Sequence, residues 1–340
     1  MPNEIVEQII QQILETDEGT RSDETGENSK PSWKLLEAFS CTCWNFRLLA
    51  LPVWFRTLYL KSASDIQDIQ TLFPVLKEKW TRHLHCICFH DSQHLVWDLS
   101  GFKRLYTIRV DWLYQNFTPL YAMEDPEVVP FINVDSPIKE LDIRGVRYPS
   151  PMILQAFTNP LQHLVILKLE SLRTWCGLCH TCTLVRFPSP KPAGFLYEGG
   201  LGLSVHYARS LFSLNYLEEV IFTLPDVGFG LPSPDFPSDS DENNMWTGEC
   251  DRCIALMYDD STFRKGWMAR KRGVDVEGVH PRSIYQKPPS LKKVQWNFWM
   301  WDLTHDTKTY SQEELNVDDE AFFDVISVQN SEDEAGDAEE

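Results

Sequence analysis

A short apolar pattern, in which one hydrophobic residue is followed three and five positions later by two more, recurs along this chain. The last two positions of each copy alternate with polar residues, which is typical of a β-strand with one buried face. The four clearest copies are Ile138-Leu141-Ile143, Leu161-Leu164-Ile166, Leu217-Val220-Phe222 and Leu291-Val294-Trp296. The pattern predicts several strands that share one buried face, each preceded by a helix or turn that packs against it.

Looser copies of the pattern come earlier, at Leu84-Cys86-Cys88 and Leu105-Ile108-Val110. The arrangement resembles the core of leucine-rich repeats, whose strands stack side by side in a curved solenoid. The spacing from Ile138 to Leu161 is within the roughly 20 to 29 residues of such repeats, whereas the later gaps are far longer. The resemblance implies an α/β fold with an irregular leucine-rich-repeat-like solenoid over residues 61–310. The alternative is an ordinary α/β domain whose strands begin after charged residues.

The first sixty residues have apolar residues at helical spacing instead. From Asn3 to Leu14 these residues form one wide stripe of an α-helix, for which Asn3 suits the N-cap. Residues 15–32 are polar and acidic and predict a flexible insertion. A helical pattern resumes at Trp33 and ends at Pro52. We therefore expect a helix, an insertion, two helices and a strand in residues 1–60.

These sixty residues resemble the F-box family in four sub-motifs that occur in the right order. That family opens with Leu-Pro-x-Glu-Ile, continues with an apolar helix ending in Leu, and then shows Ser-x-x-Cys-x-x-Phe-Arg. The matching residues here are Pro2, Glu4 and Ile5, the helix that ends at Leu14, the set Ser40, Cys43, Phe46 and Arg47, and the trailing run from Leu49 to Leu58. This chain differs in having Met1 in place of the first Leu and in its long insertion.

The resemblance implies a substrate-recruiting subunit of a cullin-RING ubiquitin ligase, not an enzyme. Its N-terminal helices would bind the small adaptor subunit of that ligase, and its C-terminal domain would bind an unknown target protein. Three short helices cannot bury all of their apolar residues among themselves, which agrees with a binding role. The alternative is a ligase-independent interaction scaffold whose helices cap the following domain. The implied adaptor-binding residues are Pro2, Glu4, Ile5, Ile9, Ile10, Leu14, Leu35, Leu36, Phe39, Cys43, Phe46 and Leu49.

Two cysteine pairs have the spacing of metal ligands. Cys176 and Cys179 form one Cys-x-x-Cys pair, and Cys250 and Cys253 form another. Two such pairs supply the four thiolates of a tetrahedral zinc site, although the stretch between them is longer than in ordinary zinc fingers. A structural zinc ion at these four residues is one interpretation. Reduced cysteines, with neither a metal nor any other cofactor, are the other.

Composition limits the class of partner. The net charge of -19 disfavours nucleic acid, because phosphate binding requires a basic surface. The sequence has neither the long apolar run of a membrane span nor a secretory signal, so we expect no membrane partner and a location in the cytoplasm or the nucleus. The nine cysteines would then be reduced. The sequence also lacks a phosphate-binding glycine loop, a Gly-x-Ser-x-Gly elbow and a His-Glu-x-x-His helix.

Four further segments have distinctive compositions. Residues 225–245 are rich in Gly, Pro, Ser and Asp and predict a long exposed loop, and the acidic residues 311–340 predict a largely disordered tail. The basic run at residues 270–272 predicts a solvated face or a weak nuclear-import signal. The aromatic run from Trp296 to Trp301 predicts a last strand that caps the open end of the sheet, or a target-docking face.

Overall fold

The computed structural model describes residues 2–15, 22–23, 26–27, 30, 32–89, 96–113, 130–146, 149–185, 194–226, 246–271 and 286–300. The chain divides into two compact units, Met1–Trp299 and Met300–Glu340. The elements below lie in the first unit, except that the last strand ends at Met300. The predicted tail, and the predicted loop from residue 227 onward, lie outside the described residues.

Three helices form the N-terminal part: α1 (Asn3–Glu15), α2 (Lys34–Thr42) and α3 (Trp44–Trp54). The backbone at Cys43 is extended and separates α2 from α3. The Cys43 sulfur accepts a hydrogen bond from the Phe46 amide at 3.5 Å, which caps α3. The predicted helices are therefore present. The prediction that Pro52 ends the last of the three is wrong, because α3 includes Pro52 and continues to Trp54. Within the predicted insertion, β1 (Ser22–Asp23) pairs antiparallel with β2 (Gly26–Glu27).

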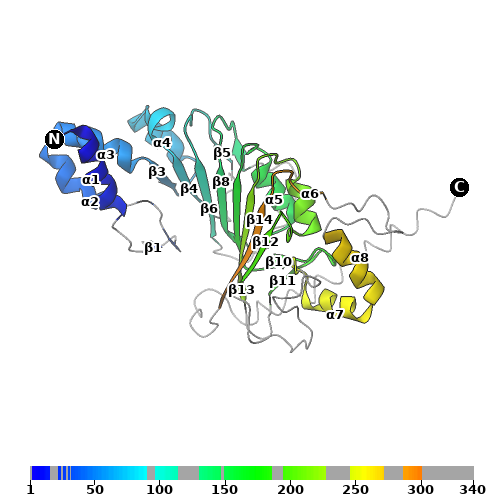
Figure 1. The fold of residues 1–340 in the computed structure, drawn as a ribbon. Coiled ribbons are helices and arrows are strands. Elements are labelled where there is room, and N and C mark those ends of the chain that lie inside the picture. Colours follow the sequence, from blue (N-terminus) through cyan, green and yellow to red (C-terminus); the bar gives the residue numbers. More distant parts are fainter. Residues whose placement is uncertain are drawn as a thin grey trace. The chain divides into compact units, whose positions relative to one another are not determined.

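An eight-stranded sheet dominates the remainder (Figure 1). Six strands run parallel, each beside its neighbour in this order: β3 (Thr57–Leu60), β4 (His83–Phe89), β6 (Thr107–Leu113), β8 (Glu140–Val146), β9 (Ile166–Ser171) and β13 (Glu219–Asp226). Next to β13 lies β14 (Lys293–Met300), and β12 (Gly194–Glu198) closes the sheet antiparallel to β14. The spatial order of these strands follows the chain except at β12, as stacking of successive units requires.

One row of backbone carbonyls sets the register of the strands. The Arg56 carbonyl accepts hydrogen bonds from the amides of Arg82 and His83, and the Arg82 carbonyl accepts from those of Tyr106 and Thr107. The same two-amide arrangement recurs at the carbonyls of Tyr106, Lys139, Val165 and Glu218. This carbonyl ladder aligns the start of each strand with the start of the next.

The apolar pattern produces layers across the buried face of the sheet. Leu141, Leu167 and Val220 lie side by side in one layer, and Ile143, Leu169 and Phe222 lie in the next. The predicted copies therefore match the strands, with one correction. The copy predicted at Leu161-Leu164-Ile166 is in fact Leu164-Leu167-Leu169, three residues later, because leucines at 161, 164 and 167 repeat the same spacing and Ile166 alternates to the other face.

Helices cover the buried face. Four helical elements each contribute a residue to the core of the sheet. They are α4 (Asp65–Leu72) with Ile66, the π-helical turn η1 (Leu76–Trp80) with Leu76, α5 (Pro151–Thr158) with Phe157, and α6 (Val205–Leu211) with Leu211. Two further helices are α7 (Asp251–Asp259) and α8 (Ser261–Lys271). Two more short strand pairs lie outside the large sheet. In one, β10 (Thr174–Trp175) pairs antiparallel with β11 (Cys182–Thr183), and in the other, β5 (Trp97–Asp98) pairs parallel with β7 (Phe131–Ile132).

The structure is thus a mixed α/β fold with a mainly parallel sheet. The finer assignment to a leucine-rich-repeat solenoid stays a prediction, as do the domain boundaries. None of the described helices has both the length and the apolar character that a bilayer crossing needs.

Candidate functional site

The three N-terminal helices bury a small core and still expose large apolar side chains. Val6, Ile10, Leu36 and Ala50 fill the core. Five apolar residues of the same helices are exposed, and we call this set the apolar helical face: Ile5, Ile9, Leu35, Trp44 and Leu48. Ile5 and Ile9 are four residues apart on α1, as Trp44 and Leu48 are on α3, so each pair lies on one side of its helix. A helix that only packs inward leaves such positions polar.

The predicted adaptor-binding residues divide by burial. Pro2, Glu4, Ile5, Ile9, Leu35 and Cys43 are exposed, whereas Leu14, Phe39, Phe46 and Leu49 are half-buried. Ile10 and Leu36 are fully buried, so in this structure they support the helices rather than offer a surface. Phe39 and Phe46 stack at 4.5 Å between ring centroids and join α2 to α3. Sequence reasoning did not select Trp44 and Leu48, although their spacing on one helix could have indicated them.

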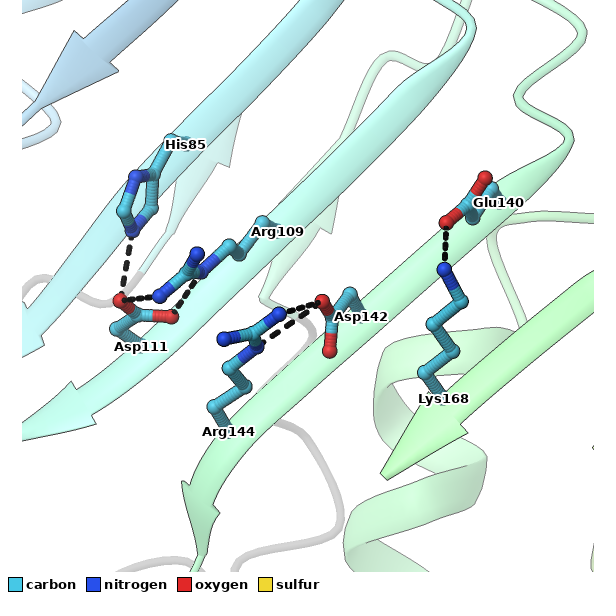
Figure 2. Close-up of polar contacts among 7 residues, drawn as sticks. All are labelled: His85, Arg109, Asp111, Glu140, Asp142, Arg144 and Lys168. Carbon is cyan, nitrogen blue, oxygen red and sulfur yellow. Dashed lines mark hydrogen bonds and ion pairs between the residues drawn. The ribbon is translucent and has the colours of Figure 1, made fainter. Parts of the chain in front are cut away.

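A second candidate surface is the polar face of the sheet, opposite the helices that cover its core (Figure 2). Asp111 on β6 is its centre. The Asp111 carboxylate accepts hydrogen bonds from Arg109 Nε at 2.7 Å and Nη2 at 2.8 Å, and it lies 2.8 Å from His85 Nε2 on β4. Two donor atoms of one guanidinium on one carboxylate form a strong, directional pair.

The neighbouring strands continue this polar face. Arg144 contacts Asp142 on its own strand, with Nε and Nη2 each 3.0 Å from one carboxylate oxygen. The Lys168 ammonium on β9 lies 2.5 Å from a carboxylate oxygen of Glu140 on β8. The Arg144–Asp142 pair therefore lies within one strand, whereas the Lys168–Glu140 pair joins two strands. Burial raises the pKa of the nearby Glu170 carboxyl, although Arg144 opposes that effect. The face is therefore an ordered arrangement of paired charges.

Asp111 should contribute to stability in a pH-dependent way. Burial alone would raise the pKa of the Asp111 carboxyl, but hydrogen bonds from His85 and Arg109 hold it below its ordinary value. A lowered pKa in the folded state stabilises the protein above pH about 4, and this contribution is lost as the pH falls through the folded-state pKa. Asp111→Ala should therefore lower the free energy of unfolding by about 2 kcal/mol at pH 7.

Urea unfolding of the wild type and Asp111→Ala at pH 7 and pH 3 measures this contribution. The stability gap between the two proteins should narrow at pH 3, because that pH lies below the ordinary pKa of an aspartate carboxyl and the unfolded wild-type chain binds a proton there. A gap of equal size at both pH values would mean that the side chain stabilises the sheet by packing and not by charge.

The four predicted metal-ligating cysteines come together. Cys176 and Cys179 lie on the turn between β10 and β11, while Cys250 immediately precedes α7 and Cys253 lies in its first turn. All four sulfur atoms lie within 4.8 Å of one another. The Cys250 amide also donates a hydrogen bond to the Cys176 sulfur at 3.4 Å. These residues, hereafter the four-cysteine cluster, could bind a metal ion.

The thiols of this cluster act on one another's protonation. Hydrogen bonds from Cys176, Cys250 and Cys253 lower the pKa of Cys179. The bond with Cys179 raises the pKa of Cys176, but those with Cys250 and Cys253 more than offset it and bring it to about 7. Hydrogen bonds with Cys176 and Cys179 raise the pKa of both Cys250 and Cys253. Some thiolates therefore form readily while others retain protons, which a bound cation would displace.

Lys271 is placed differently from what the sequence predicted, and Cys182 is a nearby cysteine for which no metal-binding role was predicted. Cys182 lies outside the four-cysteine cluster, and burial raises the pKa of its thiol to about 12. The basic run at residues 270–272 does not form a solvated face throughout, because Lys271 is buried and pairs with the buried Glu249. The residues next to Cys182 and Lys271 in the sequence did not indicate where either side chain lies.

Comparisons of the chain with protein-family models, with curated proteins and with solved structures find no match.

Proposed function

We propose that this protein is a substrate-recruiting subunit of a cullin-RING ubiquitin ligase of the F-box type. The observation that carries the proposal is the apolar helical face. The helices already bury Val6, Ile10 and Leu36, and Ile5, Ile9 and Leu35 still leave 44%, 40% and 37% of their surface exposed. An apolar helical surface that docks in a groove of a partner is a common recognition mode.

The local roles of the F-box-like residues support the same proposal. Ser40 is buried and its hydroxyl donates to the Glu37 carbonyl at 2.9 Å in the last turn of α2. Cys43 caps α3, and Phe46 stacks on Phe39. The Ser-x-x-Cys-x-x-Phe stretch thus fixes the angle between two helices. A defined angle would hold the apolar side chains in position for a rigid partner.

The α/β part would bind the target protein. In this proposal the partly exposed Arg144 and Lys168 of the polar face provide charged groups for recognition, and the protein itself breaks no bonds. Its contribution to ubiquitin transfer is proximity, because a tethered target lysine reaches the charged ubiquitin carrier at high effective concentration.

A ligase-independent scaffold is the second candidate, and Trp54 is the observation that favours it. Trp54 at the end of α3 packs against both the helical core and the core of the sheet. Its ring lies 5.1 Å from that of Trp33 and 4.7 Å from that of Phe55. The helices therefore also serve as a cap on the first strand, which is all that a scaffold would require of them.

Binding of the recombinant ligase adaptor to the full chain separates the two candidates. Isothermal titration calorimetry should give a 1:1 complex with a dissociation constant in the micromolar range or below, because several apolar anchors are buried together. If the two purified proteins do not interact, the ligase proposal fails and the helices are a cap.

We also infer that the ion suited to the four-cysteine cluster is zinc, in a structural role. Zinc bound by four thiolates at about 2.3 Å places the sulfur atoms about 3.8 Å apart, and the Cys179 and Cys250 sulfurs are 3.7 Å apart. That separation is far too long for a disulfide bond of about 2.05 Å. Four protein ligands leave no open position for substrate, so a metal here would join β10 and β11 to α7 rather than catalyse a reaction.

A further inference from the structure

The segment that supplies two of the four cysteines, residues 246–271, contacts the sheet through Trp246 and enters the core at Ile254 and Trp267. We call this segment the clasp. Trp246 at one end lies against Trp296, with ring centroids 5.0 Å apart, and its carbonyl accepts a hydrogen bond from Tyr197 at 2.8 Å. Lys271 at the other end is fully buried, whereas Leu256 and Phe263 between them are exposed. The clasp is therefore held by a few buried side chains along its length, including Ile254 and Trp267, and by the cysteines.

A buried carboxylate ties the two ends of the clasp together. Glu249 accepts hydrogen bonds from the Thr247 amide and hydroxyl, each at 2.8 Å, and from Trp267 Nε1 at 3.0 Å. It also forms an ion pair with Lys271, and both side chains are at most 2% exposed. All of these donors belong to the clasp. Glu249 directly precedes Cys250, so the ion pair lies one residue from a cluster sulfur ligand.

The charge of a zinc–thiolate centre makes the position of Lys271 significant. One divalent cation and four thiolates carry a formal charge of about −2, which is costly to place in a buried site unless positive charge lies nearby. The Lys271 ammonium lies 5.7 Å from the centroid of the Trp267 ring, and that ring lies beside Gly177 in the turn that contains Cys176 and Cys179, so the lysine is near the cluster. Glu249 reduces the compensation while it holds the lysine in place.

We propose that Lys271 is a positioning and charge-compensating residue for the metal centre of the four-cysteine cluster, and that Glu249 limits the metal affinity that Lys271 confers. The proposal rests on the zinc site inferred above. A group outside the ligand set that contacts or faces metal ligands commonly changes metal affinity by about 10- to 100-fold.

Opposite effects of two substitutions test this role. Lys271→Met should weaken zinc binding by about 10- to 100-fold, because the centre loses its counter-charge. Glu249→Gln keeps one oxygen acceptor for Trp267 Nε1 and the Thr247 hydroxyl, loses the acceptor for the Thr247 amide and removes a negative charge, so zinc binding should become tighter. A purely structural ion pair would make both variants bind zinc more weakly, since either change leaves a buried charge unpaired.

Competition with a chelator measures the zinc affinity of the full chain. Cobalt in place of zinc gives the absorption bands that report thiolate coordination. Lys271→Arg should restore most of the affinity that Lys271→Met loses, which separates charge from folding. Lys77→Met is the matched control, because Lys77 is another buried lysine and lies over Phe102, away from the cysteines. It should leave zinc affinity unchanged.

Each outcome has a distinct meaning. A wild-type chain that binds neither metal stoichiometrically overturns the zinc site itself. A wild-type chain that binds zinc, with Lys271→Met and Glu249→Gln weakened alike, overturns only the role given to Lys271. Opposite shifts, with rescue by arginine, support the proposal.

Discussion

Replacing Ile9 and Leu35 together by aspartate should weaken adaptor binding at least about 100-fold. Both residues are 37–40% exposed on the apolar helical face, so a carboxylate at either position can reach water in the free protein. In a complex the two carboxylates would be buried in an apolar groove without partners, and each unpaired buried charge costs several kcal/mol. The loss should appear in calorimetry as a dissociation constant raised beyond the measurable range.

Leu72→Asp supplies the matched control for this experiment. Leu72 is an exposed leucine of α4, outside the three N-terminal helices, so the same change of chemistry should leave adaptor binding intact. Circular dichroism should show unchanged helix content in both variants. If the Ile9→Asp, Leu35→Asp double variant binds the adaptor as tightly as the wild type does, then the adaptor uses another surface.

Trp296→Ala should lower the free energy of unfolding by about 4 kcal/mol, the usual range for a buried tryptophan being about 3–5 kcal/mol. Trp296 is fully buried in β14 and stacks on Phe222, with ring centroids 4.1 Å apart. Its indole nitrogen donates to the Gly202 carbonyl at 3.0 Å. Alanine would leave a large cavity, remove the contact with Trp246 and leave that carbonyl without its donor.

Trp299 on the same strand is the internal comparison. It is 39% exposed, so Trp299→Ala should cost less than about 1 kcal/mol. Urea unfolding followed by far-ultraviolet circular dichroism measures both variants independently of tryptophan fluorescence. Equal losses from the two substitutions would contradict the assignment of Trp296 to the core layer of the sheet.

Much of the strand pattern could be predicted because alternation reflects burial directly. Val294 and Trp296 alternate in the sequence and are both fully buried in β14. The register of β9 could not be predicted, because leucines at 161, 164 and 167 satisfy the same spacing twice. Only pairing of Leu167 with Leu141 and Val220 selects between the two alternatives. Local sequence does not contain that long-range information.

The N-terminal helices were predictable, but their exposed side was not. A wide apolar stripe includes both Ile9 and Ile10, and the structure exposes the first and buries the second. Neighbouring helices decide which part of such a stripe becomes core. The four-cysteine cluster was predictable because paired cysteines have few other uses at that spacing. Glu249 and Lys271 were not, because isolated charged residues are usually solvated.

The carbonyl ladder has a mechanical consequence. From Arg56 to Lys293, the ladder bonds each strand of the large sheet from β3 to β13 to the next strand along that sheet. A pulling force applied to the N-terminal helices would therefore load the hydrogen bonds between β3 and β4 first and then those of each later pair. Such a sheet should peel strand by strand under small forces, rather than resist until all strands shear at once.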